Sequence, residues 1–303
     1  MTDVYYLPEY ARAAAAIERG EACILHRDGV VFPVVVRETP TGVRDVTNPY
    51  GYGGALAPDD ESGQAFYAWY DEWCRERGIV TSFIRFHPLL GNHRYAEPLF
   101  HVEAVAGSVS WRLEGDLFAA MHPHHRRAVR KAERAGIEAS VTAAPGDLAP
   151  FARLYEETMR RAGASPFYFF PAEYWRGLEG RDWVVLLEGG EAAVLCFATP
   201  PWLHYQFGAS AEAARSTGAT HLLMLRAAQW GQERGYEQFH LGAGVGGGPF
   251  LEFPYDPPGW TPDRRDFFLA EPIRPDGDGY VAVPHRPGLG AELDQDALAR
   301  FET

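Results

Sequence analysis

Two stretches of this sequence, ACILHRDGVVFPVVV at 22–36 and WVVLLEGGEAAVLCF at 183–197, each place two short apolar runs on either side of a glycine-containing turn. Asp28-Gly29 and Gly189-Gly190 tolerate the positive φ that tight hairpin turns require. Each stretch therefore predicts a β-hairpin. Because the two hairpins look alike, the segments that follow them decide whether a larger unit is repeated.

A helix with the same ending follows each hairpin. Both endings read W-x-x-E-R-G, at 73–78 and at 230–235. The final glycine suits a helix C-cap, and a strand is expected next, at 79–86 and at 236–241. The shared order of hairpin, helix and strand indicates an internal duplication. We therefore predict an α/β (α+β) fold of two similar domains, each a mixed, mainly antiparallel sheet flanked by helices.

The composition is that of an ordinary globular protein, with 46% hydrophobic and 23% charged residues. The 28 basic and 41 acidic residues give a formal net charge of −13, which disfavours broad binding to nucleic acid, and we expect no DNA partner. The three cysteines lie far apart in apolar runs, as is typical of reduced cysteines in the cytosol. No apolar stretch reaches the roughly 18–20 residues of a spanning helix, so we expect a cytoplasmic protein with no membrane insertion.

Several common enzyme motifs are missing from the sequence. The glycine-rich run at 242–248 follows a predicted strand, but Pro249 and Pro254 prevent the helix that a dinucleotide-binding motif needs. The histidines at 122, 124 and 125 lack the spacing of metal ligands on one helix, and we expect no metal. There is no G-x-S-x-G motif and no Walker lysine, so hydrolase and ATPase functions are not indicated.

One predicted helix concentrates positive charge. Residues 115–136, between the two copies, have a helical pattern, with Pro123 at a helix start and Gly136 at the end. The basic residues fall at i, i+3, i+4 and i+7, which places on one face Arg127, Arg130, Lys131 and Arg134. Two interpretations stay open: a solvated helical face, or a contact with the phosphates of a substrate.

The second copy contains a strand with polar residues, WLHYQFGAS at 202–210. His204 and Gln206 alternate along it with Tyr205 and Phe207, so one face offers hydrogen-bonding groups while the other packs. Another histidine, His240, closes the strand that precedes the glycine-rich run. A histidine at such a position is more often structural than catalytic, and both interpretations stay open.

Six segments form an ordered set along the chain: NPYGYGG (48–54), RFHPLL (85–90), RRAVRKAERAG (126–136), LYEETMRR (154–161), GAS (208–210) and FHLGAG (239–244). With this set the sequence resembles, over roughly residues 45–255, the Fem-like proteins, which are the FemABX peptidyltransferases and their relatives in the GNAT acyltransferase superfamily. The resemblance implies two tandem GNAT-like domains, in agreement with the duplication. We place them at 1–114 and 115–303, the second domain including the basic helix at 115–136.

Members of this family join an acyl group to an amine. Many take an amino acid from aminoacyl-tRNA to build peptidoglycan bridges or peptide-like natural products, and others are acyl-CoA-dependent. The resemblance therefore implies an N-acyltransferase without a tightly bound cofactor, with the acceptor end of a charged tRNA as donor and a small-molecule or peptidoglycan-type amine as acceptor. The alternatives are an acyl-CoA-dependent N-acetyltransferase and a degenerate, non-catalytic protein that binds a metabolite.

The same resemblance implies roles for single residues. Arg161, in the pattern Thr158-x-x-Arg161, would contact a phosphate or carboxylate of the substrate, and Tyr205 would line the acceptor channel. Tyr205, His204 or His240 would take the proton from the amine, directly or through water. The basic helix would meet the phosphates of the donor. The other substrate-binding candidates are Tyr168, Tyr52, Arg85, Ser210, Gly242, Gly244 and Phe253.

The chain departs from the family pattern in three respects. Phe253 is followed by Pro254 where the family often has a lysine, and Lys131, the only lysine, lies elsewhere. A lysine-dependent mechanism therefore does not transfer to this chain. The sequence has no room for the long antiparallel helical arm of several Fem ligases, and its glycine motif reads Gly-Ala-Gly where three glycines are common.

Overall fold

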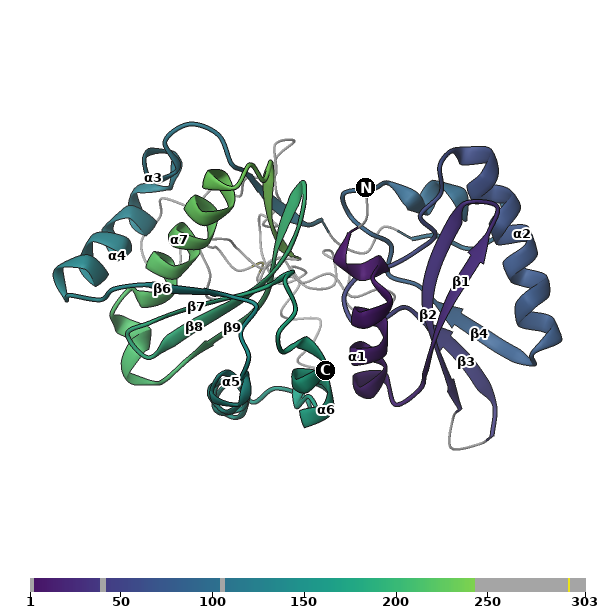
Figure 1. The fold of residues 1–303 in the computed structure, drawn as a ribbon, viewed down its shortest axis with the longest axis horizontal. Helices are drawn as coiled ribbons and strands as arrows, with labels where there is room; N and C mark the ends of the chain where they lie inside the picture. The colour runs from purple at the N-terminus through teal and green to yellow at the C-terminus, as the bar shows by residue number, and fades with distance from the viewer. Residues whose placement is uncertain (1–2, 39–41, 104–106, 243–293, 295–303) are drawn as a thin grey trace. The chain divides into compact units, whose positions relative to one another are not determined.

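The computed structural model describes residues 3–38, 42–103, 107–242 and 294. Residues 1–102 and 109–242 form one compact unit, which contains two β-sheets (Figure 1). The second unit comprises residues 103–108 and 243–303, and only positions 103, 107, 108 and 294 of it are described.

The first sheet has four strands in the order β1-β2-β3-β4. β1 (Glu21–Arg27) and β2 (Val30–Glu38) form the first predicted hairpin, with Asp28 and Gly29 at positive φ. β3 (Arg44–Thr47) pairs antiparallel with β2 and parallel with β4 (Ile79–Phe83). α2 (Asp60–Glu76) connects the two parallel strands, and its rings of Phe66, Tyr67 and Tyr70 pack on Phe32 of β2.

The second sheet has six strands in the order β5-β10-β9-β8-β7-β6. β7 (Val184–Gly189) and β8 (Ala192–Thr199) form the second predicted hairpin. β9 (Trp202–Ser210) pairs antiparallel with β8 and parallel with β10 (Gln238–Gly242), and α7 (Ala219–Glu233) connects β9 to β10. β5 (Val109–Arg112) and β6 (Ser140–Ala143) form the two edges of the sheet.

The two sheets repeat one topology, which confirms the predicted fold of two mixed sheets flanked by helices. In each copy an antiparallel hairpin is followed by a third antiparallel strand, a helix and a parallel strand. β5 belongs to the second sheet although it precedes residue 114. The division at residue 114 stays a prediction.

The remaining helices cover the two sheets (Figure 1). α1 (Pro8–Glu18) packs on α6 (Ala172–Leu178) so closely that a Cβ on Gly177 would lie 2.6 Å from Cβ of Ala13. α5 (Ala149–Ala162) packs on β9, while α3 (Leu117–Ala120) and α4 (Pro123–Arg134) pack on α7. Four short 3-10 helices complete the described elements: η1 (Val4–Tyr6), η2 (Asn92–Tyr95), η3 (Pro166–Tyr168) and η4 (Ala213–Ser216). Within the described ranges, no helix has the length and apolar character needed to cross a bilayer.

A cluster of aromatic rings fills the core beside β9. Phe207 of β9 is 4% exposed, and its ring centroid lies 5.3–5.4 Å from those of Tyr155, Phe170 and Trp175. Tyr155 comes from α5 and Trp175 from α6, so this aromatic core ties two helices to the strand that carries His204.

Candidate active site

The candidate site lies where the parallel strands β9 and β10 stop pairing. Their last paired residues are His204 and His240, and β9 then continues to Ser210, whereas β10 ends at Gly242. The opposite edge of β9 has a β-bulge, because Leu195 faces Phe207 while Cys196 faces Tyr205, which leaves Gln206 as the extra residue. Strand divergence and a bulge both occur preferentially beside functional sites, since they free backbone groups and redirect side chains.

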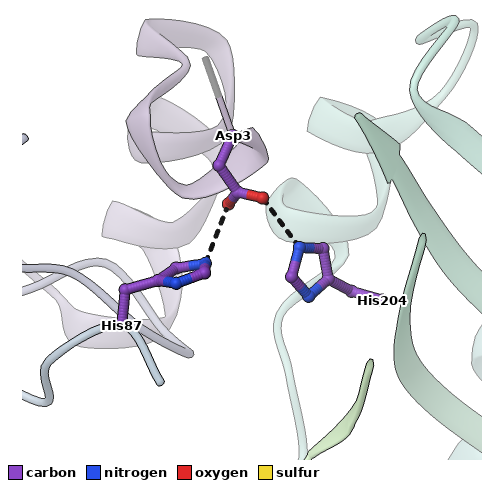
Figure 2. Close-up of side chains that lie close together, drawn as sticks. All are labelled: Asp3, His87 and His204. Atoms are coloured by element: carbon purple, nitrogen blue, oxygen red, sulfur yellow. Dashed lines mark hydrogen bonds and ion pairs between the residues drawn. The ribbon is translucent and has the colours of Figure 1, made fainter. Parts of the chain in front are cut away.

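A buried carboxylate, that of Asp3, lies against His204. Asp3 is the N-cap of η1 and is 2% exposed. Oδ2 of Asp3 lies 2.7 Å from Nε2 of His204 and also accepts the hydroxyl of Thr199 at 3.3 Å, while Oδ1 accepts the N–H of Tyr5. Figure 2 shows the carboxylate between the rings of His204 and His87, whose Nε2 is 3.5 Å from Oδ1.

The second nitrogen of His204 faces the other histidine of the pair. Nδ1 of His204 lies 3.1 Å from Nδ1 of His240. Nε2 of His240 is buried and has no hydrogen-bond partner among the described residues. Buried polar atoms are nearly always hydrogen-bonded in native proteins, so an orphaned nitrogen of this kind needs a functional explanation. Tyr52 borders this ring, with the two ring centroids 5.4 Å apart.

The backbone assigns the tautomer of His87. The N–H of Leu89 donates to Nδ1 of His87, so a neutral ring carries its proton on Nε2, the nitrogen that faces Asp3. His87 is 1% exposed and follows the Gly53–Phe86 bridge, which extends the parallel pairing of β3 and β4. Both parallel strand pairs of the repeat therefore direct a histidine toward this carboxylate.

The pKa values of the cluster follow from burial and from this one negative charge. Burial raises the pKa of the Asp3 carboxyl, but electrostatic attraction to the rings of His204 and His87 and their hydrogen bonds outweigh burial and hold that pKa far below its usual range. Burial also lowers the pKa of His87, against the effect of Asp3. Burial together with the neighbouring rings of His204 and His87 lowers the pKa of His240 to about 3. His240 is therefore neutral at pH 7, and Asp3 is ionised.

Asp3, His87 and His204 are also the one group of described residues whose potential metal-ligand atoms all lie within 4.8 Å of one another. Their hydrogen bonds do not fit a metal. A metal-bound histidine normally donates its second N–H to a partner, whereas the second nitrogen of His87 accepts an N–H. Nε2 of His204 is already in direct hydrogen-bond contact with the carboxylate. The cluster is better described as a carboxylate held by hydrogen-bond donors.

We therefore expect treatment with metal chelators to leave the stability of the protein unchanged. We expect purified protein to contain no stoichiometric zinc, iron or manganese by mass spectrometry, and we expect EDTA and phenanthroline to leave its melting temperature where it was. Stoichiometric metal, together with a lower melting temperature after chelation and its recovery on adding the metal back, would contradict this assignment.

Of the other predicted catalytic and substrate-binding residues, Tyr205 and Ser210 lie on β9, and Arg161 lies on α5. Burial raises the pKa of Tyr205 well above its usual value, so its phenol stays neutral and is a poor base. The guanidinium of Arg161 donates to the carbonyl of Ser210 at 2.6 Å and pairs with Glu212 at 3.2 Å. Arg161 and Ser210, both predicted to bind substrate, therefore contact each other, and the guanidinium is engaged by the protein itself.

The remaining predicted substrate-binding residues lie on several segments. Tyr52 borders His240, and a Cβ on Gly242 would lie 4.0 Å from the hydroxyl of Tyr52. Arg85 and Tyr168 are exposed, on the segment after β4 and in η3. Gly244 and Phe253 lie outside the described residues. Tyr52 and Gly242 are thus the two of this set that the structure brings to the histidine pair.

The predicted basic helix is α4, and its four cationic side chains Arg127, Arg130, Lys131 and Arg134 are exposed. The guanidinium of Arg130 lies 5.3 Å above the ring of Phe118. α4 contacts the start of α7, because a Cβ on Gly218, the N-cap of α7, would meet the carbonyl of Ala128. Gly218 supplies no side-chain cap, so the positive end of the α7 dipole lies beside this basic helix.

Two residues of the cluster, Asp3 and His87, are not predicted from the sequence. Asp3 is 201 positions from His204 along the chain, and its local pattern is that of an ordinary helix N-cap. His87 stands inside the motif RFHPLL, where only Arg85 is singled out. One sequence pattern could have indicated both residues, because each is a polar residue within an otherwise apolar or aromatic stretch.

Comparison with known proteins identifies a similar domain and similar folds. The family described as acetyltransferase (GNAT) domain matches residues 119–250, which include β9, α7 and β10. No curated protein matches the sequence significantly. Among solved structures, FemX superimposes with a TM-score of 0.59 at 13% identity, covering 79% of this chain and 83% of FemX.

Two further structures share the fold. The C-terminal domain of a putative lysylphosphatidylglycerol synthetase from Agrobacterium fabrum has a TM-score of 0.52 at 16% identity, covering 76% of this chain and 73% of that one. L-PGS from Bacillus licheniformis has a TM-score of 0.52 at 12% identity, covering 84% and 81%. The resemblance to Fem-like proteins inferred from the sequence is confirmed at the level of fold. Residues 119–250 are thus similar to the acetyltransferase (GNAT) domain, and the two mixed sheets of the chain resemble the tandem GNAT-like fold of FemX.

Proposed function

We propose that this protein is an N-acyltransferase that takes an amino acid from an aminoacyl-tRNA and joins it, through an amide bond, to the amine of a small-molecule or peptidoglycan-type acceptor. The observation that carries the proposal is Nε2 of His240, which is buried at the point where β9 and β10 part and has no hydrogen-bond partner in the described part of the chain. This point lies inside the segment that matches the GNAT domain.

The reaction needs little covalent chemistry from the protein. An activated ester reacts with a neutral amine when the two are aligned, and alignment alone supplies up to ~7–11 kcal/mol of the barrier. The open edge of β9, beyond its last pair with β10, offers backbone N–H groups of the kind that stabilise a tetrahedral oxyanion. His240 would accept the proton of the attacking amine and return one to the oxygen of the leaving ribose. The amide bond then forms as the ester bond breaks, with no net change in protonation of the protein.

The basic face of α4 is the proposed contact for the phosphates of the donor. It lies beside the positive end of α7, and both features attract phosphate oxygens. The chain as a whole carries a net charge of −13, so a local patch of this kind is what a polyanionic donor would need. Arg85, Tyr168 and Tyr52 are proposed to bind the acceptor. Arg161, which donates to the carbonyl of Ser210, is proposed to bind substrate at the end of β9.

A screen of donors tests the proposal. The protein is incubated with radiolabelled aminoacyl-tRNAs, and separately with labelled acetyl-CoA, in the presence of a cell extract as a pool of acceptors. Transfer from a charged tRNA to a small component of the extract is the expected result. Transfer from neither donor would overturn the proposal and would favour a non-catalytic protein that binds a metabolite.

One observation favours a second candidate, an acyl-CoA-dependent N-acetyltransferase. The matching family is described as an acetyltransferase, and coenzyme A also carries phosphates that could meet α4 and the start of α7. Transfer from acetyl-CoA alone would establish this function instead. In both reactions the cell extract would supply the acceptor amine, and the basic face of α4 would contact the phosphates of the donor.

Removing three charges from α4 is expected to weaken binding of tRNA. Replacing Arg127, Arg130 and Arg134 with glutamine should lower affinity at least about tenfold at low salt, and should reduce the slope of log K against log salt by about 2, since each phosphate contact contributes ~0.7–0.9. Filter binding over a series of salt concentrations measures both quantities. The matched control replaces three exposed arginines elsewhere, Arg12, Arg75 and Arg176. An unchanged slope in the α4 variant would show that this face is merely solvated.

A further inference from the structure

We infer that Asp3, His204 and His240 form a proton relay, in which His240 meets the reacting amine and His204, paired with Asp3, holds the resulting charge. This inference rests on the proposed acyl transfer and adds a positioning residue, Asp3, that the sequence does not reveal. It follows from the two contacts that link these side chains in series and from the nitrogen at one end of the series, which has no hydrogen-bond partner among the described residues.

The hydrogen bonds define the resting positions of the protons. The ionised carboxylate of Asp3 can only accept, so at 2.7 Å the proton between Asp3 and His204 belongs to Nε2 of His204. A neutral His204 then has a bare Nδ1, which must accept at 3.1 Å from Nδ1–H of His240. His240 in turn has a bare Nε2, the atom that has no partner. Every proton in the series is thereby assigned, and the one free lone pair lies at its end.

Uptake of a proton reverses one hydrogen bond and breaks none. The amine nitrogen gives its proton to Nε2 of His240, and Nδ1–H of His240 moves to Nδ1 of His204. His204 becomes an imidazolium that donates to Asp3 with one nitrogen and to His240 with the other. Return of the proton to the leaving oxygen runs the same steps backwards. The heavy-atom contacts stay the same, so the side chains need no reorientation.

The relay explains how a ring with a low pKa can serve as a base. Burial and the adjacent rings oppose a positive charge on His240 itself. The charge moves instead to His204, which contacts the carboxylate directly. A negative charge within hydrogen-bond distance of an imidazolium stabilises it strongly when both are buried.

The surroundings of the two rings contain few other ionisable groups. Tyr5 and Tyr52 lie edge-on to the cluster, with Tyr5 5.3 Å from His204 and Tyr52 5.4 Å from His240 by ring centroid. Burial raises the pKa of Tyr5 well above its usual value, so its phenol stays neutral, and it donates to Gln206 at 2.9 Å. His87 contacts the other oxygen of Asp3 and lies outside the series. Among the described neighbours, Asp3 is the single acidic group that faces His204.

Nitrogen NMR of histidine-labelled wild-type protein tests the relay without any substrate. The expected spectrum at pH 7 shows His204 protonated at Nε2 and His240 protonated at Nδ1, with the other nitrogen of each ring bare. Assignment uses His204→Gln and His240→Gln, and His93→Gln, an exposed histidine, serves as control. A resting His240 that carries its proton on Nε2 would overturn the relay, whatever the protein catalyses.

The variant Asp3→Asn tests the role of the carboxylate in turnover. We expect kcat to fall by about 10- to 100-fold with KM for the donor unchanged, and the acidic limb of the pH–rate profile to move to lower pH, because loss of the anion makes the protonated pair less stable. His87→Gln, which removes the other histidine at Asp3, should leave the tautomers of His204 and His240 as they are. An Asp3→Asn enzyme with wild-type kcat and an unmoved limb would overturn the relay. If Asp3→Asn does not fold, the wild-type NMR decides the question alone.

The two measurements separate failure of the relay from failure of the proposed function. The expected tautomers in a protein that uses neither donor would leave the relay intact and remove the acyl transfer. Transfer from a donor by a protein whose resting His240 carries its proton on Nε2 would support the acyl transfer and overturn the relay.

Discussion

Replacing His240 with glutamine is expected to lower the turnover of acyl transfer by about 10²- to 10⁴-fold, which is the range that a positioned general base contributes. Glutamine nearly retains the size of the ring and can hydrogen-bond to His204, but it cannot accept a proton from an amine. The KM for the donor should change little, because His240 is not proposed to bind the donor. Initial rates with the donor identified by the screen, measured over a range of concentrations, give both constants.

Two further variants sharpen this result. Tyr205→Phe should keep turnover within about twofold, because burial keeps that phenol neutral and unsuited to proton transfer. His93→Gln, on the exposed surface, controls for the loss of a histidine as such. If Tyr205→Phe loses turnover while His240→Gln retains it, the proton passes through Tyr205 and His240 has no part in catalysis.

Replacing Phe207 with alanine is expected to lower the free energy of unfolding by about 3–5 kcal/mol. The ring of Phe207 is buried and contacts rings from both α5 and α6. Its removal leaves a cavity, because the two helices and the strand cannot all move inward to fill the space. Urea unfolding followed by tryptophan fluorescence measures the change. Trp175, one of the rings that touches Phe207, makes this signal sensitive to the site.

An exposed phenylalanine of the same region provides the control. Phe167 in η3 is 48% exposed, and Phe167→Ala should lower the free energy of unfolding by about 1 kcal/mol or less. Equal losses in the two variants would show that the aromatic core is less tightly packed than its ring contacts indicate. Because Phe207 and His204 share β9, a folded Phe207→Ala protein should also have reduced turnover.

The sequence predicts the repeated architecture well because each copy contains strong local signals. Asp28-Gly29 forms the expected turn, and Gly78 and Gly235 end their helices at positive φ. The second hairpin turns one residue later than expected, at Gly190-Glu191, because Gly189 still pairs with Ala192. The helix with the basic face also forms where Pro123 and Gly136 indicate it. These features depend on residues only a few positions apart, which is the range over which sequence patterns have a direct physical cause.

The candidate site is only half predicted, because it is assembled over long distances. His204 and His240 are recognisable as polar residues on strands, and the parallel pairing of β9 with β10 sets them side by side. Asp3 reaches them from the other end of the chain, and its local role as the cap of η1 hides its second role. His87 likewise depends on the Gly53–Phe86 bridge, for which the local sequence gives no pattern. Contacts of this kind follow from the packing of the whole fold.

The two copies of the repeat differ at the ends of their parallel strands, besides the two extra edge strands of the second sheet. In the first copy the chain stays paired beyond its parallel strands, since the N–H of Gly53 donates to Arg85 and the N–H of His87 donates to Gly53. In the second copy β9 continues beyond its last pair with β10. The same edge is therefore bridged in the first sheet, whereas among the described residues of the second sheet β10 leaves the far end of β9 uncovered. A repeat of one topology thus yields two edges that differ in the backbone groups left without a strand partner.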